Sequence, residues 1–197
     1  VQAMRHPGSW GAVAAHAPDV GFDWVYRPGF PDTCLVLEEY GGDPRRFLEV
    51  FWGKRIPAGR DFGALLTVAM AATYDPDPRQ PGRIRLPFDV HTCALDEERW
   101  ARWLAHDPLQ LLDSHADGLR QLEGLWLDVG GRDQYHIQFG LRAFSAELEK
   151  RAIDHHFVEF NGTHSHLDWR LDHSLPYLAR ALQTENNEHE TRDGQGA

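Results

Sequence analysis

Three short apolar runs along the chain predict buried parallel strands. Turn residues bound each run, and the runs lie at Gly11–Pro18, Glu123–Asp133 and Asp154–Phe160. Between the second and third, apolar residues recur every three or four positions and predict an amphipathic helix, with Ile137, Leu141, Phe144, Leu148 and Ala152 on one face. Strand, helix and strand in this order form a βαβ unit, which implies neighbouring parallel strands. The pattern therefore predicts an α/β fold with a mostly parallel sheet flanked by helices.

Helical patterns also lie at the two ends of the chain. The pattern of Val1–His6 predicts the C-terminal part of a helix, which ends at Pro7 and Gly8. Near the other end, leucines at 171, 175, 178 and 182 predict a last helix. We expect Ser174 to restart this helix as its N-cap, with Pro176 in the first turn.

The interval from about 20 to 120 does not repeat the strand–helix rhythm. It carries turn-rich aromatic segments and three helical patterns, and an insertion this long inside a compact domain is usually functional. We predict that 20–120 forms a cap over one end of the sheet. The expected organisation is a partial α/β domain over 1–183, followed by a disordered polar tail over 184–197.

Composition narrows the class of protein. With 197 residues and no apolar run near the ~18 residues that a membrane span needs, the chain is predicted to be one soluble domain. Its net charge of −10, without a basic block, argues against nucleic acid and anionic membranes as partners and favours a small or neutral substrate. Two cysteines without a C-x-x-C motif support neither a disulfide framework nor a thiolate zinc site. A cytoplasmic location is the default expectation.

Polar residues follow each predicted strand, where α/β proteins hold their ligands and catalytic groups. They are His16 with Asp19 after the first strand, Asp128 or Asp133 after the second, and His164 or His166 after the third. An acid after one strand and a histidine after the next is the second half of the Ser…Asp…His order found in α/β-hydrolases. In that arrangement the histidine is the general base and the acid orients it.

Two stretches carry a resemblance to a known family. The segment LWLDVGGRDQYHIQFGLRAFSAELEKRAIDHHFVEFNGTHSHLDWRLDHSLPYLARAL resembles the C-terminal half of the putative-esterase family of α/β-hydrolases, which includes esterase D and the enterochelin esterases. The opening VQAMRHPGSWGAVAAHAPD resembles the stretch that follows the family's G-x-S-x-G nucleophile turn. The resemblance implies an α/β-hydrolase fold, a carboxylic ester as substrate and no cofactor. It also implies that the nucleophilic serine lies upstream of Val1, so that this chain is an inactive fragment completed by a missing N-terminal part.

The resemblance assigns roles to particular residues. Asp133 matches the family's acid in the turn beyond the glycines, with Asp128 as the competitor, and His164 matches its G-x-H histidine. Asp128 could instead be a strand-terminal carboxylate bonded to backbone or to Arg132. The predicted substrate-binding residues are His16 at the first strand's end and two aromatic residues of the expected cap, Trp24 and Tyr26. Packing within the cap is an equally good account of those aromatic side chains.

Three alternatives remain at this stage. His164, His166 and Asp168 could form a metal site, but no further ligand set is visible in the sequence, so we predict no metal. None of the five serines lies in G-x-S-x-G, and Cys93 beside His91 lacks the turn that a nucleophile requires. The chain could therefore be a non-catalytic α/β-hydrolase-like module that binds a ligand through its cap.

Overall fold

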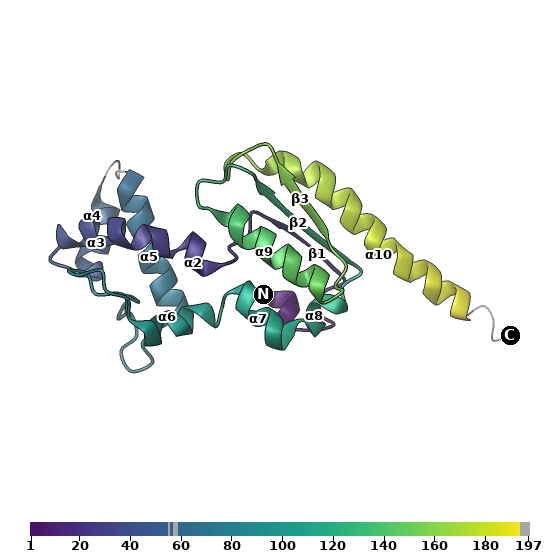
Figure 1. Cartoon of the computed structure of the whole chain (residues 1–197), viewed down its shortest axis with the longest axis horizontal. Coiled ribbons are helices and arrows are strands. Elements are labelled where there is room, and N and C mark those ends of the chain that lie inside the picture. The colour runs from purple at the N-terminus through teal and green to yellow at the C-terminus, as the bar shows by residue number, and fades with distance from the viewer. Residues whose placement is uncertain (55, 57–58, 194–197) are drawn as a thin grey trace. The chain divides into compact units, whose positions relative to one another are not determined.

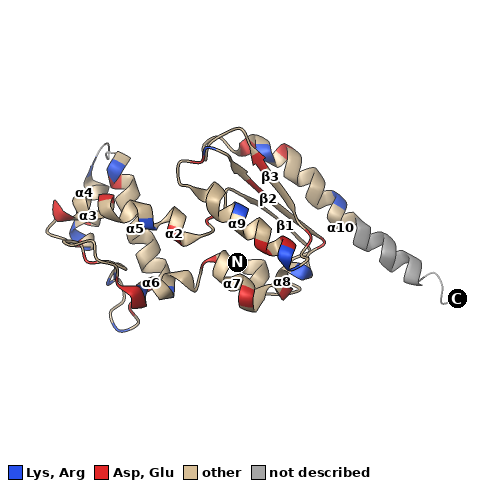
Figure 2. Ribbon diagram, viewed as in Figure 1, with Lys and Arg blue, Asp and Glu red and all other residues tan. Residues whose placement is uncertain are grey.

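The computed structural model describes residues 1–54, 56 and 59–193, the last ten of these by their backbone alone. The chain divides into two compact units, one made of Val1–Gly21 with Asp107–Ala197 and the other of Phe22–His106. We call them the sheet unit and the helical unit. Charges of both signs are interspersed on each unit (Figure 2). Among the described residues no helix combines the length and the apolar character needed to cross a membrane.

A parallel three-stranded sheet forms the centre of the sheet unit. Its strands are β1 (Ala12–His16), β2 (Gly124–Gly130) and β3 (His156–Phe160), in the order β1-β2-β3. All three predicted strands are thus confirmed, and β2 is buried along its whole length. In the register His16 lies opposite Asp128, and Gly130 lies opposite Phe160. The carboxyl ends of the strands therefore meet at one edge of the sheet.

Two long helices cover opposite faces of this sheet (Figure 1). Helix α9 (Ile137–Lys150) packs on the face that carries Leu125 and Leu127, and its buried residues include four of the five predicted by the 3.6-residue period. Helix α10 (Leu171–Asp193) packs on the face of Trp126, whose ring meets that of Tyr177 at 5.4 Å between centroids. The short helices of this unit are α1 (Gln2–Arg5), α7 (Pro108–His115), α8 (Asp117–Arg120) and the 3-10 turn η2 (Asp168–Arg170).

The start of α10 differs from the prediction. Ser174 is not an N-cap, because the helix begins at Leu171 and includes Pro176 in its interior. Ser174 is instead fully buried, with its hydroxyl bonded to a side chain of the sheet. The helix continues to Asp193, where the sequence predicts a disordered tail from Thr184. Side chains of 184–193 and the whole of 194–197 lie outside the described residues.

The helical unit contains helices, turns and one isolated antiparallel β-bridge, between Phe88 and Leu95, among its described residues. The helices are α2 (Phe22–Val25), η1 (Arg27–Gly29), α3 (Phe30–Glu38), α4 (Pro44–Gly53), α5 (Gly59–Tyr74) and α6 (Glu97–Leu104). The three helical patterns in this part of the sequence are confirmed. The unit ends at His106, earlier than the predicted boundary near 120, because α7 packs against α1 and α9 of the sheet unit.

Aromatic side chains make the core of the helical unit. Phe30 packs on Phe88 at 4.5 Å between centroids, and Trp103 lies edge-on to Tyr26 at 5.8 Å. Such pairs add to the free energy gained by burying the rings. Cys34 is buried beside this core, and its burial, followed by contact with Cys93, raises the pKa of its thiol to about 12. The Cys34 thiol therefore stays neutral at physiological pH and is a poor nucleophile.

Candidate functional site

The turn after β2 and the loop after β3 are tied together by their backbones. Gly131 donates its N–H to the carbonyl of Phe160 at 2.8 Å, and Arg132 donates to the carbonyl of Gly162 at 3.0 Å. A side chain at Gly130 would lie 2.6 Å from the carbonyl oxygens of Gly162 and Thr163. Only glycine permits this close approach, which fixes the distance between the two segments that carry Asp133 and His164.

Asp133 and His164 meet where these two segments join. The Nδ1 atom of His164 lies 3.0 Å from Oδ2 of Asp133. The Asp133 side chain is fully buried, while 35% of the His164 side chain is exposed. The other carboxylate oxygen of Asp133 accepts the backbone N–H of Tyr135 at 2.8 Å. A carboxylate held in this way presents a fixed acceptor to the imidazole.

Two further residues hold the histidine. The side-chain Oε1 of Gln134 accepts the backbone N–H of His164 at 3.1 Å, and the ring of Tyr135 lies edge-on to the imidazole at 4.9 Å between centroids. Sequence reasoning missed both residues. The sequence could have indicated Gln134 and Tyr135 only by their position, since they directly follow Asp133 in the same turn.

This geometry defines what the pair can do chemically. Because a carboxylate only accepts hydrogen bonds, Nδ1 of His164 carries the proton of the neutral ring and Nε2 is the acceptor. The imidazole is thus oriented to take a proton from a hydroxyl group at its Nε2 side, and the buried carboxylate stabilises the imidazolium that results. The partly exposed side chain of His164 is accessible to such a hydroxyl group.

His166 is not part of this arrangement. It is exposed and has a left-handed backbone, with φ of 58°, and no interaction joins it to His164 or Asp133 in the described part of the chain. Over the same residues, no three or more His, Cys, Asp or Glu side chains gather as ligands for a metal ion. The alternative metal site at His164, His166 and Asp168 therefore gains no support.

Asp128 itself is fully buried and belongs to a different network. Its Oδ2 accepts the indole Nε1–H of Trp126 at 2.6 Å and the Nε–H of Arg170 at 2.9 Å. Its Oδ1 lies 2.9 Å from Nδ1 of His16. These three donors occupy the carboxylate, which leaves Asp133 as the aspartate that contacts His164. The proposed partner Arg132 instead donates to Oδ1 of Asn161 at 2.8 Å.

His16 joins this network rather than the Asp133–His164 pair. Its Nε2 lies 3.0 Å from the hydroxyl of Ser174, so both ring nitrogens are engaged within the protein. Asp128, His16 and Ser174 thus repeat the order of contacts in a Ser-His-Asp triad. Ser174 has no exposed surface, however, so a substrate has no access to its hydroxyl. The arrangement links β1, β2 and α10.

Arg170 anchors the end of the loop that carries His164. Its guanidinium carbon lies 4.8 Å from the ring centroid of Phe160, the last residue of β3, and 4.6 Å from that of Trp169. Together with the Asp128 contact, these rings hold η2 against the sheet. Sequence reasoning missed Arg170, because its partner is 42 residues away and no local pattern signals the pair.

Replacing Arg170 with methionine is expected to destabilise the protein by about 3–5 kcal/mol, because Asp128 would keep its buried charge without the cationic partner. Denaturant unfolding followed by circular dichroism measures the loss. Arg142→Met is the control, since the Arg142–Glu159 pair is partly exposed and such pairs contribute less than about 1 kcal/mol. Equal losses in the two variants would contradict an anchoring role for Arg170.

The aromatic candidates Trp24 and Tyr26 lie in the helical unit. Trp24 is 42% exposed and can meet a ligand. Tyr26 is buried among Phe22, Tyr74 and Trp103, so the structure corrects its predicted place in a pocket: it packs the core. In the sheet unit an apolar cavity of about 280 Å³ lies on the α9 face of the sheet, but neither Asp133 nor His164 lines it.

The sequence was compared with models of known protein families. The model of the family described as "Putative esterase" matches residues 1–175, which include both strand-end segments of the site. No curated protein matches the chain.

Proposed function

The chain belongs to the putative esterase family, and from that premise we propose that it hydrolyses a carboxylic ester through a serine nucleophile, with His164 as general base and Asp133 as the acid that orients it. One observation carries the proposal. The Nδ1 of His164 lies 3.0 Å from a fully buried carboxylate, while the ring itself remains partly exposed. This combination is what the base of a Ser-His-Asp triad requires.

The proposed reaction proceeds in two half-reactions. As a serine hydroxyl attacks the ester carbonyl, Nε2 of His164 takes its proton, and the same nitrogen then gives that proton to the departing alcohol. A water molecule next attacks the acyl-enzyme, again with His164 as base, and the carboxylic acid is released. Asp133 keeps Nδ1 protonated throughout and stabilises the imidazolium in both halves.

No serine of the described chain hydrogen-bonds to His164. Ser114 contacts His115, Ser145 contacts His155 and Ser174 contacts His16. The remaining two, Ser9 and Ser165, lie outside any G-x-S-x-G turn. The proposal therefore assigns the nucleophile to none of the five, and we expect these 197 residues alone to be inactive.

The helical unit supplies the proposed contact for the substrate. We propose that this unit is the cap of an enterochelin-esterase-like hydrolase and that Trp24 is an apolar contact for the acyl or alcohol group of the ester. The exposed side chain of Trp24 supports this role, whereas Phe22, Tyr26 and Phe30 are buried in the core of the unit.

The function is tested with a p-nitrophenyl ester and a fluorophosphonate probe, which labels activated serines covalently. Two proteins are compared: the 197-residue chain and the product of the coding sequence extended upstream of Val1. We expect labelling and hydrolysis in the extended protein and neither in the chain alone. An extended protein that is folded, unlabelled and inactive would support the non-catalytic binding module instead.

A further inference from the structure

Five arginines of the helical unit line one hollow of about 570 Å³. They are Arg79, Arg83, Arg85, Arg99 and Arg102, and the carboxylate of Asp77 is the one acidic group among the described residues of the wall. The chain carries 20 basic residues against 30 acidic ones, so a wall with five positive charges and one negative charge departs from the rest of the molecule. An anion in the hollow would meet several guanidinium groups at once.

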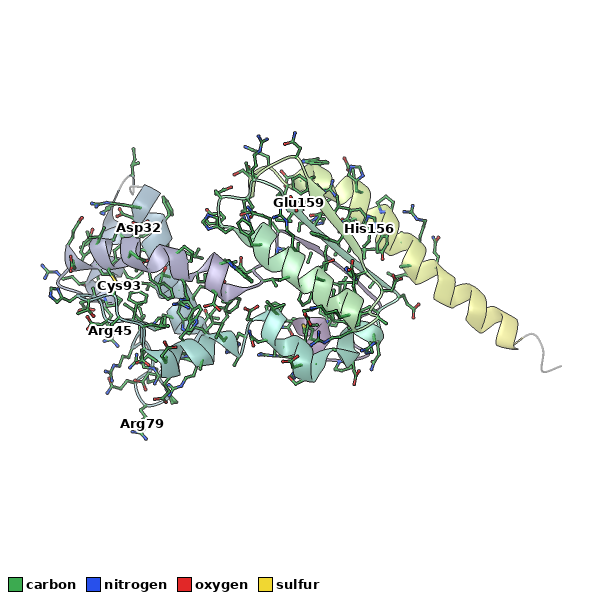
Figure 3. All side chains as sticks on the ribbon, viewed as in Figure 1. Asp32, Arg45, Arg79, Cys93, His156 and Glu159 are labelled. Atoms are coloured by element: carbon green, nitrogen blue, oxygen red, sulfur yellow. The ribbon has the colours of Figure 1, made fainter. Side chains whose placement is uncertain are left out.

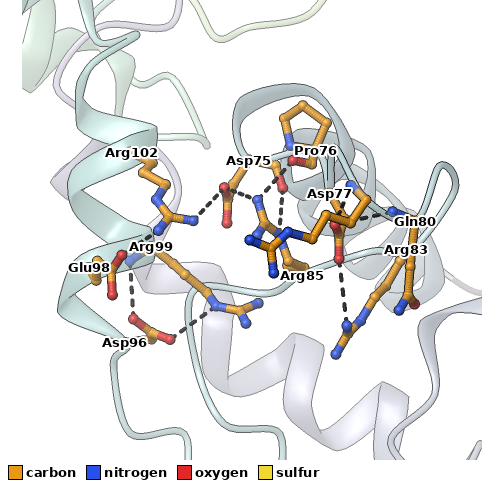
Figure 4. Close-up of polar contacts among 11 residues, drawn as sticks. Asp75, Pro76, Asp77, Gln80, Arg83, Arg85, Asp96, Glu98, Arg99 and Arg102 are labelled. Carbon is orange, nitrogen blue, oxygen red and sulfur yellow. Dashed lines mark hydrogen bonds and ion pairs between the residues drawn. The ribbon is translucent and has the colours of Figure 1, made fainter.

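A buried carboxylate holds two of these arginines in place. Asp75, almost fully buried, accepts hydrogen bonds from the guanidinium groups of Arg85 and Arg102 through the same oxygen (Figure 4). Arg85 also donates to the carbonyl of Pro76 at 2.8 Å, and Arg102 donates to Glu98. These contacts fix the two side chains on the wall, so that little conformational entropy is lost when a ligand binds.

The other three arginines keep donors that the protein does not use. Arg99 contacts Asp96 through Nε at 3.0 Å, which leaves its two terminal nitrogens without a partner among the described residues. Arg83 reaches Asp77 only at 3.5 Å. The Arg79 side chain projects away from the ribbon and has no partner in the described part of the chain (Figure 3).

Asp77 is the one carboxylate among the described residues that line the hollow. Its carboxylate accepts the backbone N–H of Arg79 at 2.9 Å, and this hydrogen bond lowers the pKa of Asp77. Asp77 is therefore ionised at neutral pH, and its charge faces Arg83. Outside the lining, Asp75, Asp96 and Glu98 pair with Arg85, Arg99 and Arg102. Five arginines thus face four carboxylates in all, and Arg79 has no carboxylate partner among the described residues.

We propose that this hollow binds a small molecule that carries a phosphate monoester or a diphosphate. The arginines would hold the ligand through that phosphate group. Guanidinium groups present paired N–H donors whose spacing matches the oxygens of phosphate, and several of them can share one multiply charged group. A volume of 570 Å³ lies within the range of small-molecule sites and leaves room for more than the phosphate itself. The site lies wholly within Phe22–His106 and requires no ester chemistry.

The full chain is titrated with pyrophosphate by isothermal calorimetry at low ionic strength, with citrate as a carboxylate probe of similar charge. Saturable binding of pyrophosphate, tighter than that of citrate, is expected. Arg79→Gln and Arg83→Gln should each weaken binding by about tenfold, since each removes a charge-assisted hydrogen bond. Arg79 is exposed and has no internal partner, so its replacement leaves the fold intact.

Arg60→Gln is the matched control. It removes the same charge from the same unit, but Arg60 pairs with Glu39 on the surface and does not line the hollow. Its affinity for pyrophosphate should equal that of the unmodified chain. Three results would overturn the proposal: no saturable pyrophosphate binding at about 1 mM, tighter binding of citrate, or an equal loss of affinity in Arg60→Gln and Arg83→Gln.

Discussion

Ester hydrolysis by the extended protein is expected to fall about a million-fold when His164 is replaced with alanine, because removing the general base from a comparable triad has an effect of that order. The buried carboxylate of Asp133 would lose its one imidazole partner, and no other histidine of the described chain contacts it. The substitution shortens a partly exposed side chain in a loop, so the fold should persist. Turnover of a p-nitrophenyl ester measures the loss.

His166→Ala provides the matched control, since it removes the same side chain two positions further along the same loop. His166 is exposed and contacts neither His164 nor Asp133 among the described residues, so activity should change less than about twofold. Activity that survives His164→Ala, or that is lost equally in both variants, would reject His164 as the base. Circular dichroism of both variants separates a loss of chemistry from a loss of structure.

The elements that the sequence predicted correctly are those whose signal is local. The period of α9 and the apolar runs of the three strands can be read from a window of a few residues, because each reflects how one segment meets a core. The start of α10 was predicted wrongly because it depends on a contact between residues that are far apart in the sequence. Ser174 has the side chain of an N-cap, but its hydroxyl is used by His16, which is 158 residues away in the sequence.

The end of the helical unit at His106 shows a similar limit. Helix α7 has a sequence like the helices before it, with an N-cap at Asp107 and a proline at Pro108. Its membership in the sheet unit depends on packing against α1 and α9. A tertiary contact of this kind has no counterpart in the local pattern of apolar residues.

The contact between Asp133 and His164 was predictable in part because glycines precede both residues. Gly130 and Gly162 bring the two strand-end segments into backbone contact, and Asp133 and His164 stand at a fixed short distance beyond them. The choice between Asp133 and Asp128 was open in the sequence, since both follow the same strand. The donors that occupy Asp128 come from β1, β2 and η2, so only the folded chain distinguishes the two aspartates.

Asp133→Asn is expected to lower ester hydrolysis by about four orders of magnitude while leaving the protein folded. The amide oxygen can still accept the N–H of Tyr135, so the turn after β2 keeps its hydrogen bond. The amide nitrogen would face Nδ1 of His164 and donate to it. The imidazole would then carry its proton on Nε2, where it can no longer accept one from serine.

Asp128→Asn separates this catalytic effect from a general sensitivity of buried aspartates. The carboxylate of Asp128 serves three donors, and an asparagine would leave the buried cation of Arg170 without a counter-charge. We expect a loss of about 3–5 kcal/mol in the free energy of unfolding, with turnover per folded molecule nearly unchanged. Asp133→Asn should show the reverse: unfolding close to that of the unmodified protein, and little turnover. If Asp128→Asn instead abolished turnover and remained stable, the acid of the site would be Asp128, and the Asp133–His164 contact would be structural.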